Sequence, residues 1–148
     1  MVRSTITNGA KSLLSRLKGN QMEDFDWVTA RCECSPGKVF AKLEAQVKSD
    51  VDTRRATLRG NVHYGFSFVP TGASSFTVLV ESNNIHHAVK FAMTETGVLV
   101  MDENSKRMFS ADVTVSDDGT CKLKVDGEEK ELWQVRQQAL EEFFFRKY

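Results

Sequence analysis

The fold is decided by residues 62–125, which read VHYGFSFVPTGASSFTVLVESNNIHHAVKFAMTETGVLVMDENSKRMFSADVTVSDDGTCKLKV. Apolar side chains recur at every second position through most of this stretch, and turn-forming residues separate the runs. Because successive side chains of a strand point to opposite faces, this alternation predicts strands with one apolar face. The turn residues divide the stretch into six strands, which predict a curved antiparallel sheet.

Helical spacing replaces the alternation before this stretch. Apolar side chains recur every third or fourth residue over residues 39–47, and Ser35-Pro36 is typical of a helix start. We expect this helix to break near Ser49-Asp50 and a shorter helix to follow from Asp52 to Leu58. The sequence therefore predicts two helices between residues 36 and 58.

A further helix is expected after the strands. Residues 132–144 again place apolar side chains at helical spacing, and this stripe must cover the apolar face of a sheet. Asp126 with Glu129 three residues later fits a capping box, so we expect the helix to begin there.

Residues 25–34 alternate as a strand would, which adds a strand ahead of the helices. The sequence thus predicts an α+β fold, a curved antiparallel sheet of about six to seven strands packed against a C-terminal helix, with helices after the first strand. We expect one domain over residues 23–148, preceded by an arm over residues 1–22.

Composition limits the classes of function. The 148 residues are 41% hydrophobic and 27% charged, which is ordinary for a soluble globular protein. Lys+Arg and Asp+Glu number 20 each, so no overall basic field predicts nucleic-acid binding. The odd count of three cysteines favours free thiols in the cytoplasm or another reducing intracellular compartment.

The arm differs from the rest of the chain in charge. Residues 1–22 hold four basic residues and no acid, and Leu13, Leu14 and Leu17 share one helical face. Such a basic amphipathic segment fits organelle targeting, contact with a membrane surface, docking on a protein partner, or an arm with no task.

The cysteine and histidine residues do not form a convincing metal-binding or catalytic site. Cys32 and Cys34 would lie about 7 Å apart on a strand, whereas two zinc-bound sulfurs lie about 3.7 Å apart, so no metal is predicted. His86 and His87 would point to opposite faces of a strand. No phosphate loop or nucleophile elbow occurs, and we predict no cofactor and no catalytic residue. An enzyme using Cys34, next to a helix start, or His87 is a third alternative.

Residues 28–43, VTARCECSPGKVFAKL, resemble the opening of the START-like helix-grip superfamily, a strand followed by a proline-started helix. The element order expected over residues 25–146 is similar to that family as well. The resemblance implies a sheet that grips the terminal helix, with a cavity between them for an apolar ligand. The implied lining is Tyr64, Phe66, Val78, His87, Phe91 and Leu132.

The sequence supports two hypotheses about function. The first is a non-enzymatic interaction module that docks a protein partner or a second copy through the basic arm and the aromatic C-terminal helix. Consecutive aromatic residues on a helix point in different directions, so one helix–sheet contact cannot bury all of residues 143–145. The alternative is a small apolar-ligand binder or carrier of helix-grip type. The predicted partner contacts are Arg3, Lys11, Leu13, Leu14, Arg16, Leu17, Phe144 and Phe145.

Overall fold

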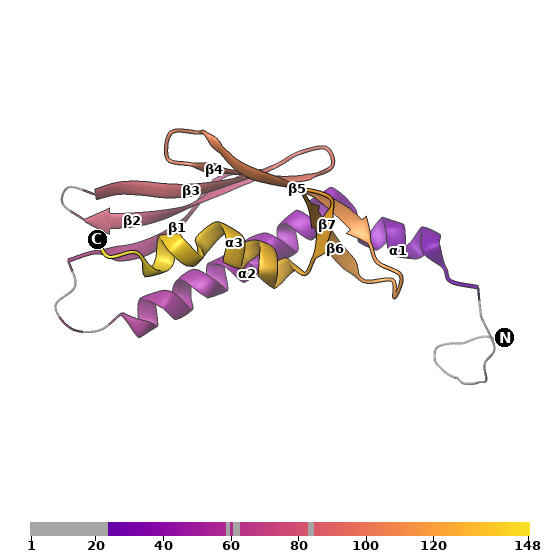
Figure 1. Cartoon of the computed structure of the whole chain (residues 1–148), viewed down its shortest axis with the longest axis horizontal. Coiled ribbons are helices and arrows are strands. Elements are labelled where there is room, and N and C mark those ends of the chain that lie inside the picture. The colour runs from indigo at the N-terminus through magenta and orange to yellow at the C-terminus, as the bar shows by residue number, and fades with distance from the viewer. Residues whose placement is uncertain (1–23, 59, 61–62, 83–84) are drawn as a thin grey trace.

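The computed structural model describes residues 24–58, 60, 63–82 and 85–148; the predicted arm lies outside these residues. The described chain is an α+β fold whose seven-stranded antiparallel sheet is open, and a helix follows the sheet, as the sequence predicts (Figure 1). The elements are α1 (Trp27–Glu33), α2 (Pro36–Thr57), β1 (Gly65–Gly72), β2 (Ser75–Ser82), β3 (Ile85–Met93), β4 (Gly97–Asp102), β5 (Arg107–Val115), β6 (Cys121–Val125), β7 (Glu128–Lys130) and α3 (Leu132–Phe145).

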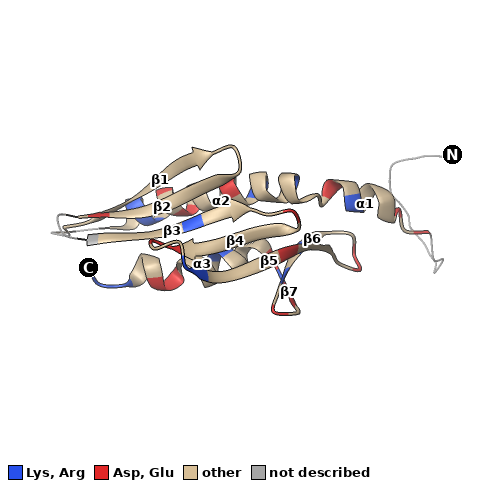
Figure 2. Cartoon of the chain, turned by 90° about the horizontal axis from the view of Figure 1, so that it is seen from above, with Lys and Arg blue, Asp and Glu red and all other residues tan. Residues whose placement is uncertain are grey.

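The sheet is a simple meander in which each strand pairs with the next in the chain. Its register places Phe76 opposite Phe91 and Val78 opposite Val89, so the apolar rows of β2 and β3 share one face. Both α2 and α3 lie on one side of the sheet (Figure 1), and acidic residues mark several turns between strands (Figure 2). The apolar alternation of the sequence therefore becomes a sheet with one face covered by helices.

Aromatic rings join α2 and α3 to the sheet. The Phe76 ring stacks on Phe91 with centroids 4.7 Å apart and lies 5.3 Å from Phe40 of α2. The Phe66 ring of β1 lies 5.6 Å from Phe143 and 5.1 Å from Phe144, both of α3. Such tilted and stacked pairs add to the free energy gained by burying apolar area.

The predicted strand at residues 25–34 is wrong, because this segment forms helix α1. Asp26 caps that helix, since its carboxylate accepts the backbone N–H of Thr29 at 3.0 Å and the Thr29 hydroxyl at 2.8 Å. No residue of α1 is buried. The alternation therefore has no core to face, and the local cap decides the conformation. Both α1 and α2 precede all seven strands.

The predicted break near Ser49-Asp50 is also wrong, because α2 runs unbroken to Thr57. Val47 and Val51 are fully buried one turn apart, so the apolar stripe continues through the polar pair. Ser49 is exposed, and Asp50 is half-buried beside Arg136 of α3, so neither residue interrupts the buried stripe.

The C-terminal helix begins at Leu132, not at Asp126. Asp126 and Gly127 have φ of 53° and 80°, the left-handed conformation of a tight hairpin turn, and they join β6 to the short strand β7. The helix is capped instead at Glu131, whose N–H donates to Gln134 Oε1 at 2.8 Å. The seventh strand of the sheet is thus β7.

A disulfide corrects the prediction of free thiols. Cys34, which is fully buried at the junction of α1 and α2, is bonded to Cys121 at the start of β6, with Cα atoms 5.3 Å apart. Cys32 is free and exposed. Disulfides are typical of oxidising compartments, so this bond argues against the predicted reducing compartment. None of the described helices is long and apolar enough to cross a membrane.

Candidate functional site

Most of the residues predicted to line a ligand cavity belong to the packed core. At most 1% of the surface is exposed at each of Phe66, Val78 and Phe91. Leu132 is also buried, at the start of α3. Their neighbours are other core side chains. Tyr64 is only partly buried and packs on the edge of this core.

The prediction for the aromatic run is confirmed. Phe143 and Phe144 are buried against the sheet, whereas Phe145 exposes 66% of its surface. Of these predicted partner contacts, Phe145 is therefore exposed and Phe144 is buried. The predicted contacts in the arm lie outside the described residues.

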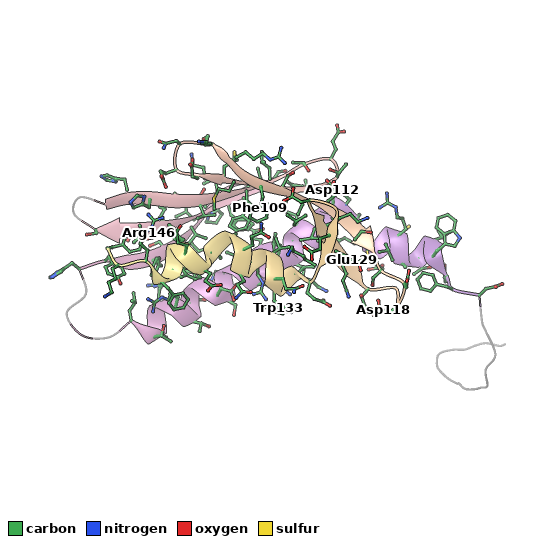
Figure 3. All side chains as sticks on the ribbon, viewed as in Figure 1. Phe109, Asp112, Asp118, Glu129, Trp133 and Arg146 are labelled. Atoms are coloured by element: carbon green, nitrogen blue, oxygen red, sulfur yellow. A yellow bond between two sulfur atoms is a disulfide. The ribbon has the colours of Figure 1, made fainter. Side chains whose placement is uncertain are left out.

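Phe145 belongs to an open groove of about 710 Å³ between α2 and α3. Trp133 also lines the groove, exposes 55% of its surface and lies on the side of α3 away from the sheet (Figure 3). The residues of each wall recur at helical spacing, so each wall is one helix face. The walls are Asp50, Thr53, Arg54 and Thr57 of α2, and Trp133, Arg136, Gln137, Leu140, Glu141, Phe144 and Phe145 of α3.

Arg54 holds one end of this α2–α3 groove in place. Its Nε donates to the backbone oxygen of Phe144 at 2.9 Å, which satisfies a carbonyl in the last turn of α3. Its guanidinium also lies 4.5 Å from the centroid of the Phe145 ring, within the range of a cation–π contact. Phe145 is thereby positioned at the groove although it is exposed to solvent.

An ion pair joins the two walls further along. Arg136 Nη1 donates to the two carboxylate oxygens of Asp50 at 2.9 and 2.8 Å. The Arg136 side chain is 18% exposed and that of Asp50 is 35% exposed. Because the pair is only partly buried, it serves to set the spacing of the helices more than to stabilise the fold.

Sequence reasoning missed Trp133 and Arg54. Trp133 directly follows Leu132, and it belongs to none of the core-facing positions of α3. A large apolar side chain off the buried stripe is the signal that could have revealed it, the same signal that revealed Phe145. Arg54 offered no such signal, because its role depends on a helix 90 residues away in the chain.

His87 lies in a separate polar cleft of about 310 Å³ between α3 and the β3–β4 part of the sheet. Its Nδ1 is 3.5 Å from Glu103 Oε1, which also accepts the backbone N–H of Ala88 at 3.1 Å. At the same cleft, Arg146 donates to Glu142 at 3.0 Å, and this hydrogen bond raises the pKa of the guanidinium. The cleft is thus lined by charged side chains of both signs, Glu103 and Glu142 beside Arg146.

The third alternative, an enzyme using Cys34, loses its nucleophile here. Cys34 is disulfide-bonded, so it offers no thiolate for attack. Among the described residues, histidine, cysteine and carboxylate side chains form no group of three or more that could hold a metal ion.

No family model, no curated protein and no solved structure matches the chain.

Proposed function

We propose that this protein is a non-enzymatic interaction module that binds an amphipathic helix of a partner protein in the α2–α3 groove. The observation that carries this proposal is the exposure of Trp133 and Phe145 along a single groove. Monomeric proteins seldom leave two large aromatic side chains exposed on one apolar surface without a partner. Tryptophan is also among the side chains that contribute most to binding at protein interfaces.

A helix is the occupant that the groove fits best. Both walls present side chains three and four residues apart, which is the geometry that receives the ridges of a third helix. Leu140 and the two exposed aromatic residues, Trp133 and Phe145, supply the apolar surface of the α3 wall. The charged residues of the walls carry both signs, so a partner helix needs charges of both signs flanking its apolar face. The basic arm, residues 1–22, is proposed to add a second, electrostatic contact to the same partner.

The test compares two tryptophans. Trp133 and Trp27 are both on helices and are 55% and 66% exposed, but only Trp133 lines the groove. Native mass spectrometry of the full chain from its source should show a stoichiometric partner. A synthetic helix from that partner should bind the wild type and the Trp27→Ala variant equally. It should bind the Trp133→Ala variant at least tenfold more weakly, about 1.4 kcal/mol.

Other outcomes would overturn the proposal. Equal binding to both variants would place the partner elsewhere on the molecule. A homodimer that dissociates in the Trp133→Ala variant would make the occupant a second copy of this chain. A strictly monomeric protein with no partner would leave the groove without a role in association.

A small-ligand binder of helix-grip type is the second candidate function. It is favoured by one observation, the partial exposure of Tyr64 and His87 beside Tyr148 at one end of the core. Two of the six implied lining residues thus lie where a ligand could reach them. No contact with nucleic acid and no cofactor is part of either proposal.

A further inference from the structure

We propose that the aromatic slot around Tyr148 is a binding site for a small phenol, and that Tyr148 is its resident, displaceable occupant. This inference deepens the second candidate function by naming the chemistry of the ligand. The phenol slot, as we call it, is formed by Tyr64, Phe66, His87 and Phe143.

The walls of the phenol slot are rings that surround one further ring. The Tyr148 centroid lies 5.1 Å from Tyr64 and 5.8 Å from His87, and it lies 6.3 Å from both Phe66 and Phe143. Three of these walls come from the sheet side, namely Phe66 in β1, Tyr64 directly before β1 and His87 in β3, and the fourth, Phe143, comes from α3. The interplanar angles to the three benzenoid walls are 62°, 73° and 69°, which are the edge-to-face arrangements that aromatic pairs prefer. The slot is therefore shaped for a six-membered aromatic ring.

The slot also recognises a hydroxyl group. The Tyr148 hydroxyl donates to the backbone oxygen of Phe143 at 2.6 Å. This oxygen belongs to the last turn of α3, where carbonyls run out of helical N–H partners. A site with one acceptor among apolar walls discriminates strongly against a ring that lacks the donor, because the acceptor is then left unpaired. A phenol is protonated at neutral pH, and burial raises the pKa of the Tyr148 phenol further.

Tyr148 can leave the slot without disturbing the rest of the fold. Helix α3 ends at Phe145, and the two residues that link it to Tyr148, Arg146 and Lys147, are exposed. Tyr148 itself is only partly buried and belongs to no strand. Its departure therefore breaks one hydrogen bond and the ring contacts, whereas the sheet and α3 keep their own hydrogen bonds.

The polar cleft next to the slot provides room for the remainder of a ligand. His87 and Phe143 line both, so the cleft of about 310 Å³ adjoins the slot. Carboxylates outnumber guanidinium groups in the cleft, which favours a phenol with a cationic substituent over one with an anionic substituent. The charged lining is Asp102, Glu103, Glu142 and Arg146.

The experiment titrates the wild type and the Tyr148→Ala variant with four probes, followed by NMR of the aromatic side chains. The probes are tyramine, phenethylamine without the hydroxyl, 4-hydroxyphenylacetate with the opposite charge, and ethylbenzene. Tyramine should shift the resonances of Tyr64, His87 and Phe143 and release the Tyr148 ring in the wild type. It should bind Tyr148→Ala at least tenfold more tightly, because no occupant has to be displaced, and phenethylamine should bind about tenfold more weakly than tyramine.

Controls keep the result interpretable. Lys147→Ala changes an exposed neighbour and should bind like the wild type, and Tyr148→Phe keeps the ring while losing the hydroxyl. If Tyr148→Ala does not fold, the titrations of the wild type and of Tyr148→Phe still test the proposal. Tyramine should displace the phenylalanine ring of Tyr148→Phe more easily than the tyrosine ring of the wild type, because that ring has no hydroxyl group to donate to Phe143. Equal binding of tyramine and ethylbenzene would overturn the phenol assignment and leave an apolar-ligand function standing. Absence of binding by every probe to the wild type and to a folded variant would overturn both.

Discussion

Gly97, the first residue of β4, lies opposite Asp112 of β5, and the neighbouring strand leaves no space for a side chain there. A Cβ on Gly97 would lie 2.0 Å from the backbone oxygen of Ala111. Relief requires the two strands to move apart, so we expect Gly97→Ala to lower the free energy of unfolding by about 1–3 kcal/mol. Urea denaturation measures this change.

Gly37 provides the matched control. A Cβ at Gly37 would meet no atom within 4 Å, and the residue lies in the first turn of α2. Gly37→Ala should therefore be neutral or stabilise the protein by up to about 1 kcal/mol, because alanine is the better helix former. Similar losses in both variants would contradict the steric explanation for Gly97.

Asp118, in the turn between β5 and β6, makes stability depend on pH. Its carboxylate accepts hydrogen bonds from the Ser116 hydroxyl, the Thr120 hydroxyl and the Thr120 backbone N–H, and these bonds lower its pKa well below the usual range. A lowered pKa in the folded state stabilises the protein above the unfolded-state pKa near about 4, and the contribution disappears as the pH falls below it.

The Asp118→Asn variant tests this contribution. Its melting temperature should be lower than that of the wild type at pH 7, and the difference should shrink progressively as the pH falls from about 5 toward 2. Thermal melts followed by circular dichroism at several pH values measure it. The exposed Asp117, for which the structure gives no such set of hydrogen bonds, is the control position.

At the scale of elements, the sequence predicts the strands well because their determinants are local. Alternation and turn residues are visible within about ten positions, and β1 to β6 all overlap the alternating runs, although β1 continues through the turn-like residues Pro70-Thr71-Gly72. The sequence predicts β7 poorly, because three residues are too few to show a period. Asp126-Gly127 is typical of a hairpin turn, but Asp126 with Glu129 also fits a capping box. The residues near Asp126 fit both structures, and the folded protein forms the hairpin and begins α3 only at Leu132.

The segment at residues 25–34 shows a different limit. Its alternation is real, but a strand requires a neighbouring strand, and a local Asp26 cap requires only the next three residues. The disulfide at its end also escapes prediction, because Cys34 and Cys121 are 87 residues apart and their meeting depends on where β6 lies.

This disulfide should matter most for α1, which contributes no buried residue of its own. By the loop-closure estimate, a cross-link over 87 residues adds about 4.6 kcal/mol to the free energy of unfolding. Replacing Cys34 and Cys121 together by serine should remove this amount and accelerate amide exchange in α1 more than in α2. Hydrogen exchange followed by mass spectrometry measures both effects.

The exposed Cys32 is the control for that pair. Cys32→Ser should leave the unfolding midpoint and the exchange of α1 unchanged. A loss of stability in this variant comparable to that of the double variant would contradict the assigned pairing.

At the scale of the whole molecule, α2, α3 and the sheet face that they cover share one apolar core. Phe76 is fully buried at its centre and contacts rings from β3 and α2. We expect Phe76→Ala to lower the free energy of unfolding by about 3–5 kcal/mol while the transition remains single. Calorimetry tests both points, since separate transitions for the helices and the sheet would contradict a shared core.

The candidate sites belong to this scale as well, which is why the sequence predicts them only in part. The order of residues alone predicts that one helix–sheet contact leaves at least one of residues 143–145 uncovered, because three consecutive aromatic residues cannot share one helix face. The α2–α3 groove and the phenol slot require α2, the sheet and α3 to be assembled first. Tyr64 and His87 were expected to face a ligand, yet their shared neighbour Tyr148 carried no signal in the sequence.

The bond between Cys34 and Cys121 turns most of the molecule into a covalent ring, which holds α2 and β1 to β5, whereas β7 and α3 are attached outside it. A protease that cuts an exposed turn inside the ring, such as the one at Asn104 and Ser105, yields two pieces that still migrate as one molecule until a reductant is added. A cut after β6 leaves α3, one wall of the groove, with no covalent link to the ring, so under denaturing conditions it separates without a reductant. Cleavage between Cys34 and Cys121 therefore leaves the two products covalently joined, whereas cleavage after Cys121 does not.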